Sequence, residues 1–455
     1  MGNSKIHILC PEYVPLENKG EEAIIRGTMD VIFGKQDNPC EYHMVDMNTD
    51  EYQYVNGLHM HPGKLFFSDW RSREFGLGLS WKQIYSSGCS LLRNFLNKFF
   101  PFWIRKPHKE ATRLKRILTG EIKGPKKYQQ SIKQLKKVNF IIAGHNGGLD
   151  EYVCHILNEL HLINIPYGIF GSSMKPNVTQ KELLNVFQKS FENSLFNIAR
   201  NPLGYKWALK NFPHCEFELN PDPAFGMFPV NDKETEKIIK ENRLSELFEK
   251  DVIMFTTAEP APISRHSFEG KVGVFQKIEA HRKFLADLLK NIYETTDANV
   301  IFLPHTIGPN IQMDDRLIAR DVIKRAGLGS DERVFLLESD LSAKELKGLI
   351  SRAEFIVAER VHSIIGAIGV RTPFMSLASD KDTRVQGILR EQMELSDLIY
   401  SLRDPSKEKA NKKFEELYNG RNKILERLET LNKRIDKELK KTGAKINKII
   451  NDLVR

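Results

Sequence analysis

Four polar side chains stand where a buried strand is expected to meet the next helix. The apolar run 355–358 is followed by Glu359, Arg360, His362 and Ser363. A helix start offers an anion free N–H groups and the positive end of the helix dipole. The fork of Arg360 suits a carboxylate or phosphate, and His362 can exchange a proton near neutral pH. The pair indicates an anion site with a proton donor, although structural hydrogen bonds explain such residues equally well.

Two further cations follow predicted strands of the same half of the chain. His305 comes after the apolar run 301–303, which is the position that matches Arg360 and His362. Lys381 lies in the polar turn 379–384 and could give a phosphate a point charge. A solvated turn explains the second segment as well.

A glycine-containing turn follows a predicted strand in the first half. After the run 138–144 the turn consists of His145, Asn146, Gly147 and Gly148. Glycine lets backbone amides approach a ligand closely, but the spacing is neither that of a dinucleotide fingerprint nor of a P-loop, so no nucleotide site is indicated. A tight structural turn is the alternative. We expect Arg200 and Asp222 to face a cleft between two domains.

The elements that must position these residues follow an α/β rhythm. Apolar runs recur, and each ends in a loop that leads towards a helix. The runs are 6–9, 138–144, 167–171, 251–257, 300–303, 334–337 and 354–358. The pattern predicts two doubly wound Rossmann-like domains, 1–225 and 226–400, with binding groups at the carboxyl ends of their strands, facing a common cleft.

Composition limits the class of protein. The chain has 455 residues, 41% of them apolar, and we find no apolar run of membrane-spanning length and no signal-type start. Its five cysteines form no C-x-x-C pair, which argues against a disulfide framework or a zinc site. We therefore expect a cytoplasmic protein, and the sequence shows no cluster of metal ligands.

The net charge of +9 is unevenly distributed. Residues 81–137 carry fifteen Lys/Arg against two acids, and residues 401–455 carry sixteen against nine, so the rest of the chain is acidic. Basicity confined to two appendages favours an anionic membrane surface over nucleic acid. Aromatic and basic residues alternate in 81–118, which is typical of an interfacial anchor that would hold the protein on the inner face of the plasma membrane. An ordinary helical insertion is the other interpretation.

The segment 401–455 is expected to be a basic helical tail. Apolar residues recur there at helical spacing, at Leu417, Ile424, Leu428, Leu431 and Ile435. This spacing predicts a long amphipathic helix, which could make a homo-oligomer or fold back on its own chain.

Four stretches together resemble the polysaccharide pyruvyl transferase family. In the family's order, they are Asn18-Lys19-Gly20-Glu21-Glu22-Ala23-Ile24-Ile25, Gly144-His145-Asn146-Gly147-Gly148-Leu149-Asp150, Asp222-Pro223-Ala224-Phe225 and Glu359-Arg360-Val361-His362-Ser363. The resemblance covers about residues 6–385 and implies two GT-B-like domains, with the acceptor on the first and the donor, phosphoenolpyruvate, on the second. The family's N-terminal loop is usually richer in glycine than 11–15 of this chain.

The resemblance implies transfer of a pyruvyl group to a sugar hydroxyl of a bacterial surface polysaccharide or its lipid-linked precursor. His362 would protonate C3 of the enol and Arg360 would hold the phosphate or carboxylate, giving a ketal or an enol ether without a further cofactor. The expected donor contacts are His305, Lys381, Ser363 and Arg200. The expected acceptor side comprises Glu21, His145, Asn146, Gly147, Gly148 and Asp222.

Two alternatives remain open at this point. A nucleotide-sugar glycosyltransferase can have the same two-domain architecture, because fold does not fix function. A non-catalytic glycan-assembly protein is the other alternative, which the basic tail favours.

Overall fold

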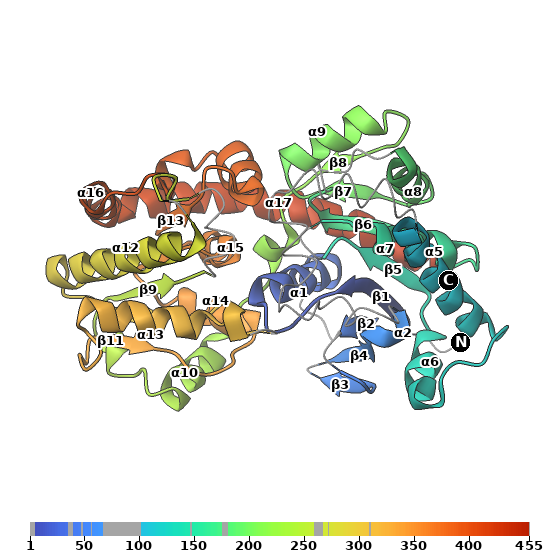
Figure 1. Ribbon diagram of the computed structural model, residues 1–455, viewed down its shortest axis with the longest axis horizontal. Coiled ribbons are helices and arrows are strands. Elements are labelled where there is room, and N and C mark those ends of the chain that lie inside the picture. Colours follow the sequence, from blue (N-terminus) through green and yellow to red (C-terminus); the bar gives the residue numbers. More distant parts are fainter. Residues whose placement is uncertain are drawn as a thin grey trace.

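Two sheets, each with helices on both faces, form the protein in a computed structural model (Figure 1). The structure describes residues 5–34, 40–46, 49–55, 57–66, 102–145, 148–174, 181–258, 267–271, 273–308 and 311–454.

The first sheet has eight strands in the order β3-β4-β2-β1-β5-β6-β7-β8. Its strands are β1 Ile6–Tyr13, β2 Cys40–Asp46, β3 Gln53–Val55, β4 Leu58–Pro62, β5 Phe140–Ala143, β6 Tyr167–Ser172, β7 Asn197–Ala199 and β8 Glu218–Leu219. Neighbouring strands pair in parallel except for the antiparallel edge strand β3.

The second sheet has six strands in the order β11-β10-β9-β12-β13-β14, all paired in parallel. Its strands are β9 Val252–Thr256, β10 Asn299–Phe302, β11 Val334–Leu336, β12 Phe355–Ala358, β13 Phe374–Ala378 and β14 Ile399–Ser401. Most central strands are continuously buried, as expected of parallel sheets covered on both faces.

The helices of the first domain are α1 Lys19–Phe33, α2 Gly63–Phe66, α5 Phe102–Thr119, α6 Gln129–Leu135, α7 Glu151–His161, α8 Lys181–Glu192 and α9 Pro202–Asn211. Those that follow are α10 Asp232–Glu241, α12 Val274–Thr295, α13 Asp315–Ala326, α14 Ala343–Ile350, α15 Val361–Val370, α16 Lys407–Asn419 and α17 Arg421–Val454. Short 3₁₀ turns lie at Lys126–Tyr128, Pro223–Gly226 (η3), Leu247–Glu249, Ile311–Met313 and Ser396–Leu398, and a π-helix, η6, spans Val385–Gln392.

Side-chain caps fix where several of these helices begin. Asn18 accepts a hydrogen bond from the Gly20 N–H at the start of α1, and Asp150 accepts one from Val153 at the start of α7. Each cap replaces a partner that the first N–H groups of a helix lack. The strand-to-helix turns of the first sheet are thereby fixed at the edge that faces the second domain.

Helix α1 packs within the first domain and also contacts α14 and α15 of the second. The Gly27 Cα lies so close to η3 that an added Cβ would be 2.1 Å from the Pro223 carbonyl oxygen. Across the interface, the Lys19 N–H donates to the His305 carbonyl (3.0 Å), and the Lys19 ammonium pairs with Asp340 (2.5 Å). The N-terminus of α1 is thus placed against the second domain.

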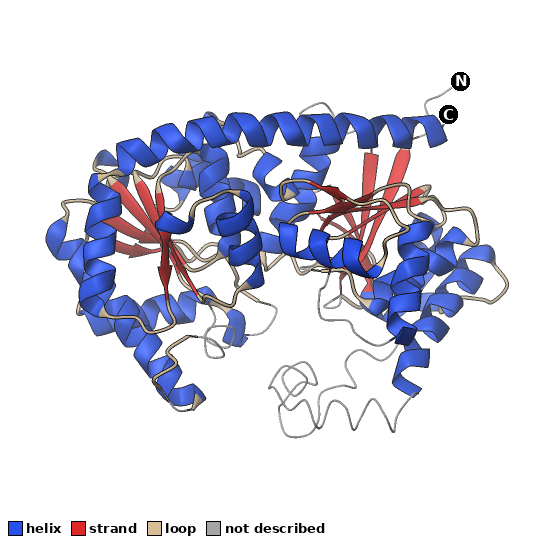
Figure 2. Ribbon diagram, turned by 90° about the horizontal axis from the view of Figure 1, so that it is seen from above, coloured by secondary structure: helices blue, strands red, loops and turns tan. Residues whose placement is uncertain are grey.

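The C-terminal helix α17 runs along both domains (Figure 2). Asn432 donates to the Ile368 carbonyl of the second domain (2.7 Å), and Asn447 donates to the Ile32 carbonyl of the first (2.9 Å). The apolar face of α17 is buried in this chain, so the helix folds back. The predicted helix is two helices, since α16 ends before Gly420 and contains Leu417. The prediction of two Rossmann-like domains with a C-terminal amphipathic helix is confirmed.

Only the end of the 81–118 insertion lies within the described residues. There α5 packs on the first domain through Leu114 and Ile117, which are buried beside α7. The anchor expected of 81–118 falls mostly on residues outside the description. No helix in the described ranges is both long and apolar enough to cross a membrane.

Candidate active site

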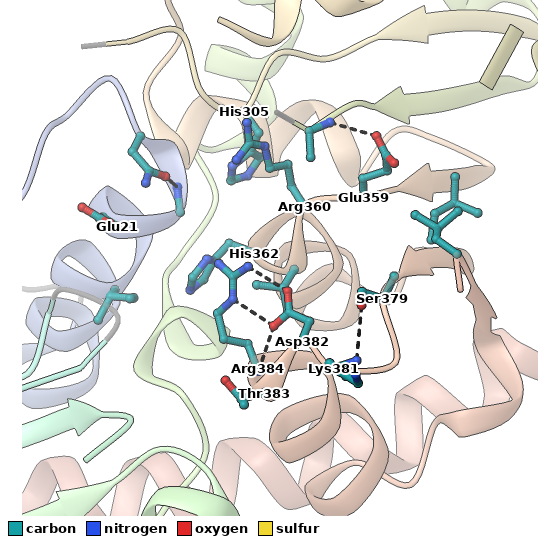
Figure 3. Close-up of a pocket in the computed structure, with 18 of the residues that line it drawn as sticks. Glu21, His305, Glu359, Arg360, His362, Ser379, Lys381, Asp382, Thr383 and Arg384 are labelled. Atoms are coloured by element: carbon teal, nitrogen blue, oxygen red, sulfur yellow. Dashed lines mark hydrogen bonds and ion pairs between the residues drawn. The ribbon is translucent and has the colours of Figure 1, made fainter. Parts of the chain in front are cut away.

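A pocket of about 380 Å³ lies between the domains, at the carboxyl ends of the strands (Figure 3). It is lined by Asn18, Gly20, Glu21, Ile24, Arg200, Ala258, His305, Glu359, Arg360, Val361, His362, Leu377, Ala378, Ser379, Lys381, Asp382, Thr383, Arg384 and Leu402. Six sequence-predicted residues are among them: Glu21, Arg200, His305, Arg360, His362 and Lys381.

Arg360 is fixed by a buried carboxylate that the sequence did not indicate. Its guanidinium lies 2.5 Å from Asp315, the first residue of α13. Asp315 also accepts the backbone N–H groups of His305 (3.0 Å) and Thr306 (2.9 Å). Burial raises the pKa of Asp315, against the opposing charge of Arg360. The carboxylate therefore holds the arginine and the β10 loop together.

His362 lies in the first turn of α15 against the first turn of α1. Its Nδ1 faces Gly20 so closely that a Cβ on this glycine would be 2.6 Å away. Its Nε2 is 3.8 Å from the buried Asp222. Burial lowers the pKa of His362, although Asp222 opposes the shift. One nitrogen of the imidazole thus faces Asp222, and the other faces the start of α1.

Asp222 links His362 to Arg200 from behind the pocket. The Arg200 guanidinium donates to Asp222 at 2.9 Å, and both side chains are fully buried. Burial alone would raise the pKa of Asp222, but Arg200 and His362 outweigh it and the pKa lies below its ordinary value. Asp222 also caps η3 by accepting the Ala224 N–H (2.9 Å). It therefore supports the site without bordering the pocket.

His305 is buried at the end of β10 and borders the pocket. Burial, reinforced by the positive charges of His362, Arg360 and Lys19, holds the pKa of His305 well below its ordinary value. The ring is therefore neutral at pH 7, a hydrogen-bonding group rather than a cation.

The loop after β13 contributes Arg384, a cation that was not predicted as a site residue from the sequence. The Lys381 side chain is exposed, and its charge acts on Glu269, which does not border the pocket. Arg384 instead reaches the ring of His362 and donates to Asp382 at 2.8 Å (Figure 3). In the sequence, 379–384 looks like a solvated turn, so only the fold identifies Arg384.

The sequence places Glu359 at a strand end beside Arg360, but its side chain makes structural hydrogen bonds. The carboxylate is 1% exposed and accepts from His281 (2.6 Å) and the Ala258 N–H (2.9 Å). Glu359 therefore ties α12 and the β9 loop to the end of β12 and borders the pocket through its backbone.

Two helices of opposite domains begin at the pocket. α1 contributes Gly20 and Glu21, and α15 begins after Arg360, whose side chain does not cap it. The N-terminal end of a helix carries partial positive charge. Together with the arginines, the two helix starts make the pocket suited to an anion.

Several predicted residues lie outside this pocket. Ser363 is buried within α15, and Gly148 does not border the pocket. His145 is buried beside Glu12; burial alone would lower the pKa of His145, but Cys10 and Glu12 outweigh it and raise the pKa to about 10. Asn146 and Gly147 lie outside the described residues. The turn after β5 thus contributes none of its described residues to the pocket.

Solved structures of trehalose-6-phosphate synthases have a similar fold. The enzyme from Burkholderia multivorans gives a TM-score of 0.53 at 10% identity, covering 99% of this chain and 100% of that chain. The UDP-forming enzyme from Burkholderia xenovorans gives 0.54 at 10% identity, with the same coverage. A structure from E. coli bound with UDP-2-fluoro glucose gives 0.52 at 10% identity, covering 99% of each chain. At these identities the likeness supports the GT-B fold alone.

The chain also matches a protein family in sequence. No curated protein matches the chain. The sequence pattern of the polysaccharide pyruvyl transferases matches residues 18–381, which include both helix starts at the pocket and the Arg-x-His element. The chain belongs to the polysaccharide pyruvyl transferase family.

Proposed function

We propose that the protein transfers a pyruvyl group from phosphoenolpyruvate to a sugar hydroxyl of a bacterial surface polysaccharide or its lipid-linked precursor. The observation that carries this proposal is the convergence of Arg200, Arg360, His362 and Arg384 on a pocket where two helices begin. Fixed guanidinium groups and helix N-termini match a small molecule with both a phosphate and a carboxylate.

His362 is the proposed proton donor. Burial lowers the pKa of its imidazole, so the ring is mostly neutral at pH 7. A bound anion next to the imidazole stabilises its charged form and raises the pKa. Donor binding thus supplies the proton that C3 of the enol must receive, and Asp222 holds the ring in place for that transfer.

The arginines have the complementary role. Protonation at C3 makes C2 cationic, the sugar oxygen bonds to C2, and the C2–O bond to phosphate later breaks. Arg360, held by Asp315, would stabilise charge on the donor as that bond breaks. Attack by a second hydroxyl of the same sugar gives the ketal. His305 and Lys381, which border the pocket, are the weaker candidates for donor contacts.

The acceptor would approach from the first domain. Glu21 borders the pocket from α1 and is partly exposed, so its carboxylate can accept hydrogen bonds from sugar hydroxyls. A lipid-linked acceptor would bring the protein to an anionic membrane surface, and the basic, aromatic segment 81–118 is the proposed contact.

A single assay separates this proposal from its alternatives. The purified chain is incubated with phosphoenolpyruvate and methyl glycosides of glucose, galactose and mannose, and phosphate release and a pyruvyl gain in mass are measured. We expect both with at least one glycoside, and neither from Arg360→Ala or His362→Ala at unchanged circular dichroism. Turnover of UDP-sugars without turnover of phosphoenolpyruvate would favour the glycosyltransferase, and no turnover of either would favour an assembly protein.

A further inference from the structure

The three arginines of the pocket differ in how firmly their carboxylate partners hold them. Arg200 and Asp222 are 1% and 0% exposed, and Arg360 and Asp315 are 20% and 1% exposed. Arg384 and Asp382 are 44% and 25% exposed. A buried pair cannot part without leaving a charge in a dry environment, whereas an exposed pair contributes little and can part easily.

Arg384 is also placed where it can act on the reacting group. Arg384 interacts electrostatically with His362 of the second domain, whose pKa it lowers, and with Glu21 of the first. The close-up shows its guanidinium next to the His362 ring, with dashed contacts only to Asp382 (Figure 3). An anion bound at the start of α15 would therefore lie within reach of this side chain.

The backbone around Arg384 would allow its guanidinium to leave Asp382 for another anion. Asp382 accepts the Arg384 N–H (2.9 Å) just before η6 begins. This contact involves the backbone, so the carboxylate can remain a cap when the guanidinium leaves it. π-Helical turns occur frequently at functional sites.

We propose that Arg384 is a donor-binding residue that exchanges Asp382 for the phosphate of the bound donor. Asp382 is the placeholder: it keeps the guanidinium in the pocket while the site is empty and competes with the incoming anion. Arg200 and Arg360 keep their buried partners throughout. The identity of the donor rests on the proposed function, but the exchange itself requires only a phosphate group.

If this exchange occurs, replacing Arg384 and replacing Asp382 should change the affinity for phosphate in opposite directions. Arg384→Gln removes the cation that binds phosphate, so affinity should fall at least tenfold. Asp382→Asn keeps a capping oxygen and removes the competing charge, so affinity should rise severalfold. Because this gain comes from releasing Arg384, it should be largely lost when Asp382→Asn is made together with Arg384→Gln.

A matched pair joins Arg390 of η6 to Asp380 of the loop that precedes it. Arg390 donates to Asp380 at 3.1 Å, and the two side chains are 29% and 35% exposed, yet neither borders the pocket. Arg390→Gln and Asp380→Asn therefore change the same kinds of charge nearby, and we expect both to leave affinity within twofold of wild type.

The test is titration calorimetry of the full chain with inorganic phosphate and with phosphoenolpyruvate. The proposal is overturned if Arg384→Gln binds both as wild type does, if Asp382→Asn binds more weakly, if the gain of Asp382→Asn persists without Arg384, or if the control pair has equal effects. Absence of phosphate binding by the wild type would also overturn it. Arg384-dependent binding without turnover of phosphoenolpyruvate would refute the proposed function and leave the exchange standing.

Discussion

At the scale of single residues, Asp222 supports two site residues at once. It neutralises the buried Arg200 and opposes the effect of burial on the pKa of His362. Replacing it with Asn keeps an oxygen for the η3 cap but removes the charge. The pKa of His362 should then fall further, because the negative charge of Asp222 no longer opposes the effect of burial.

This change should appear in the pH dependence of turnover. A general acid works while it is protonated, so kcat declines as pH rises through its pKa in the substrate complex. In Asp222→Asn the alkaline decline of kcat should begin at lower pH than in wild type. Asp321→Asn, which alters a carboxylate paired with Arg282 outside the pocket, is the control. Loss of the buried partner costs about 3–5 kcal/mol, so assays must stay below the lowered Tm. An unchanged alkaline decline would mean that His362 is not the acid.

The sequence predicts some site residues because their neighbours reveal the fold. Arg360, His362 and His305 each follow an apolar run, and strand ends of a parallel sheet converge, so their common pocket could be expected. Asp315 follows no such run, and Arg384 comes several residues after the end of its strand, β13. In the sequence, Asp315 looks like an ordinary acidic residue in the first turn of a helix, and Arg384 lies in a polar segment. Their position depends on tertiary packing, which residue types do not encode.

At the scale of elements, the starts of α1 and α15 must approach each other closely. Gly20 allows this, since a Cβ there would be 2.6 Å from Nδ1 of His362. In Gly20→Ala the imidazole must move, and displacing a catalytic group by about 1 Å can cost about 100-fold in rate. We expect kcat to fall by about that factor in the phosphate-release assay.

A second glycine provides the control for this variant. Gly366 lies in α15 itself, and the nearest atom to an added Cβ there is Ile350 Cδ1 at 3.7 Å, an ordinary contact. Gly366→Ala should keep wild-type kcat and gain up to about 1 kcal/mol from helix propensity. Equal rates in both variants would contradict a role for the close approach at Gly20.

The strands that the sequence did not predict have mixed composition. β2 contains Glu41, His43 and Asp46 among apolar residues, so no continuous apolar run marks it. Its burial follows from pairing between β1 and β4. β7, β8 and β14 are only two or three residues long, which is too short for a periodicity to be detected.

At the scale of the whole molecule, α17 links the domains independently of α1. Its first half contacts the second domain through Asn432, and its second half contacts the first domain through Thr442, which accepts from Asn220 at 2.7 Å. The apolar spacing of 417–435 predicted a helix, but not which surface it would cover. The partners are far away in the sequence, so only the assembled fold defines them.

Gly443 is where α17 passes closest to α1. A Cβ at this position would be 1.9 Å from the Val31 carbonyl oxygen, a backbone atom that cannot rotate away. Gly443→Val should therefore push the second half of α17 off the first domain, lowering the Tm by several degrees and speeding amide hydrogen exchange in α1 and in residues 436–454. Lys441→Val introduces the same side chain on the exposed face of the helix and should change neither quantity appreciably. If both variants melt and exchange alike, α17 does not hold the domains together. If only Gly443→Val has a lower Tm and faster exchange, the second half of α17 stabilises the first domain.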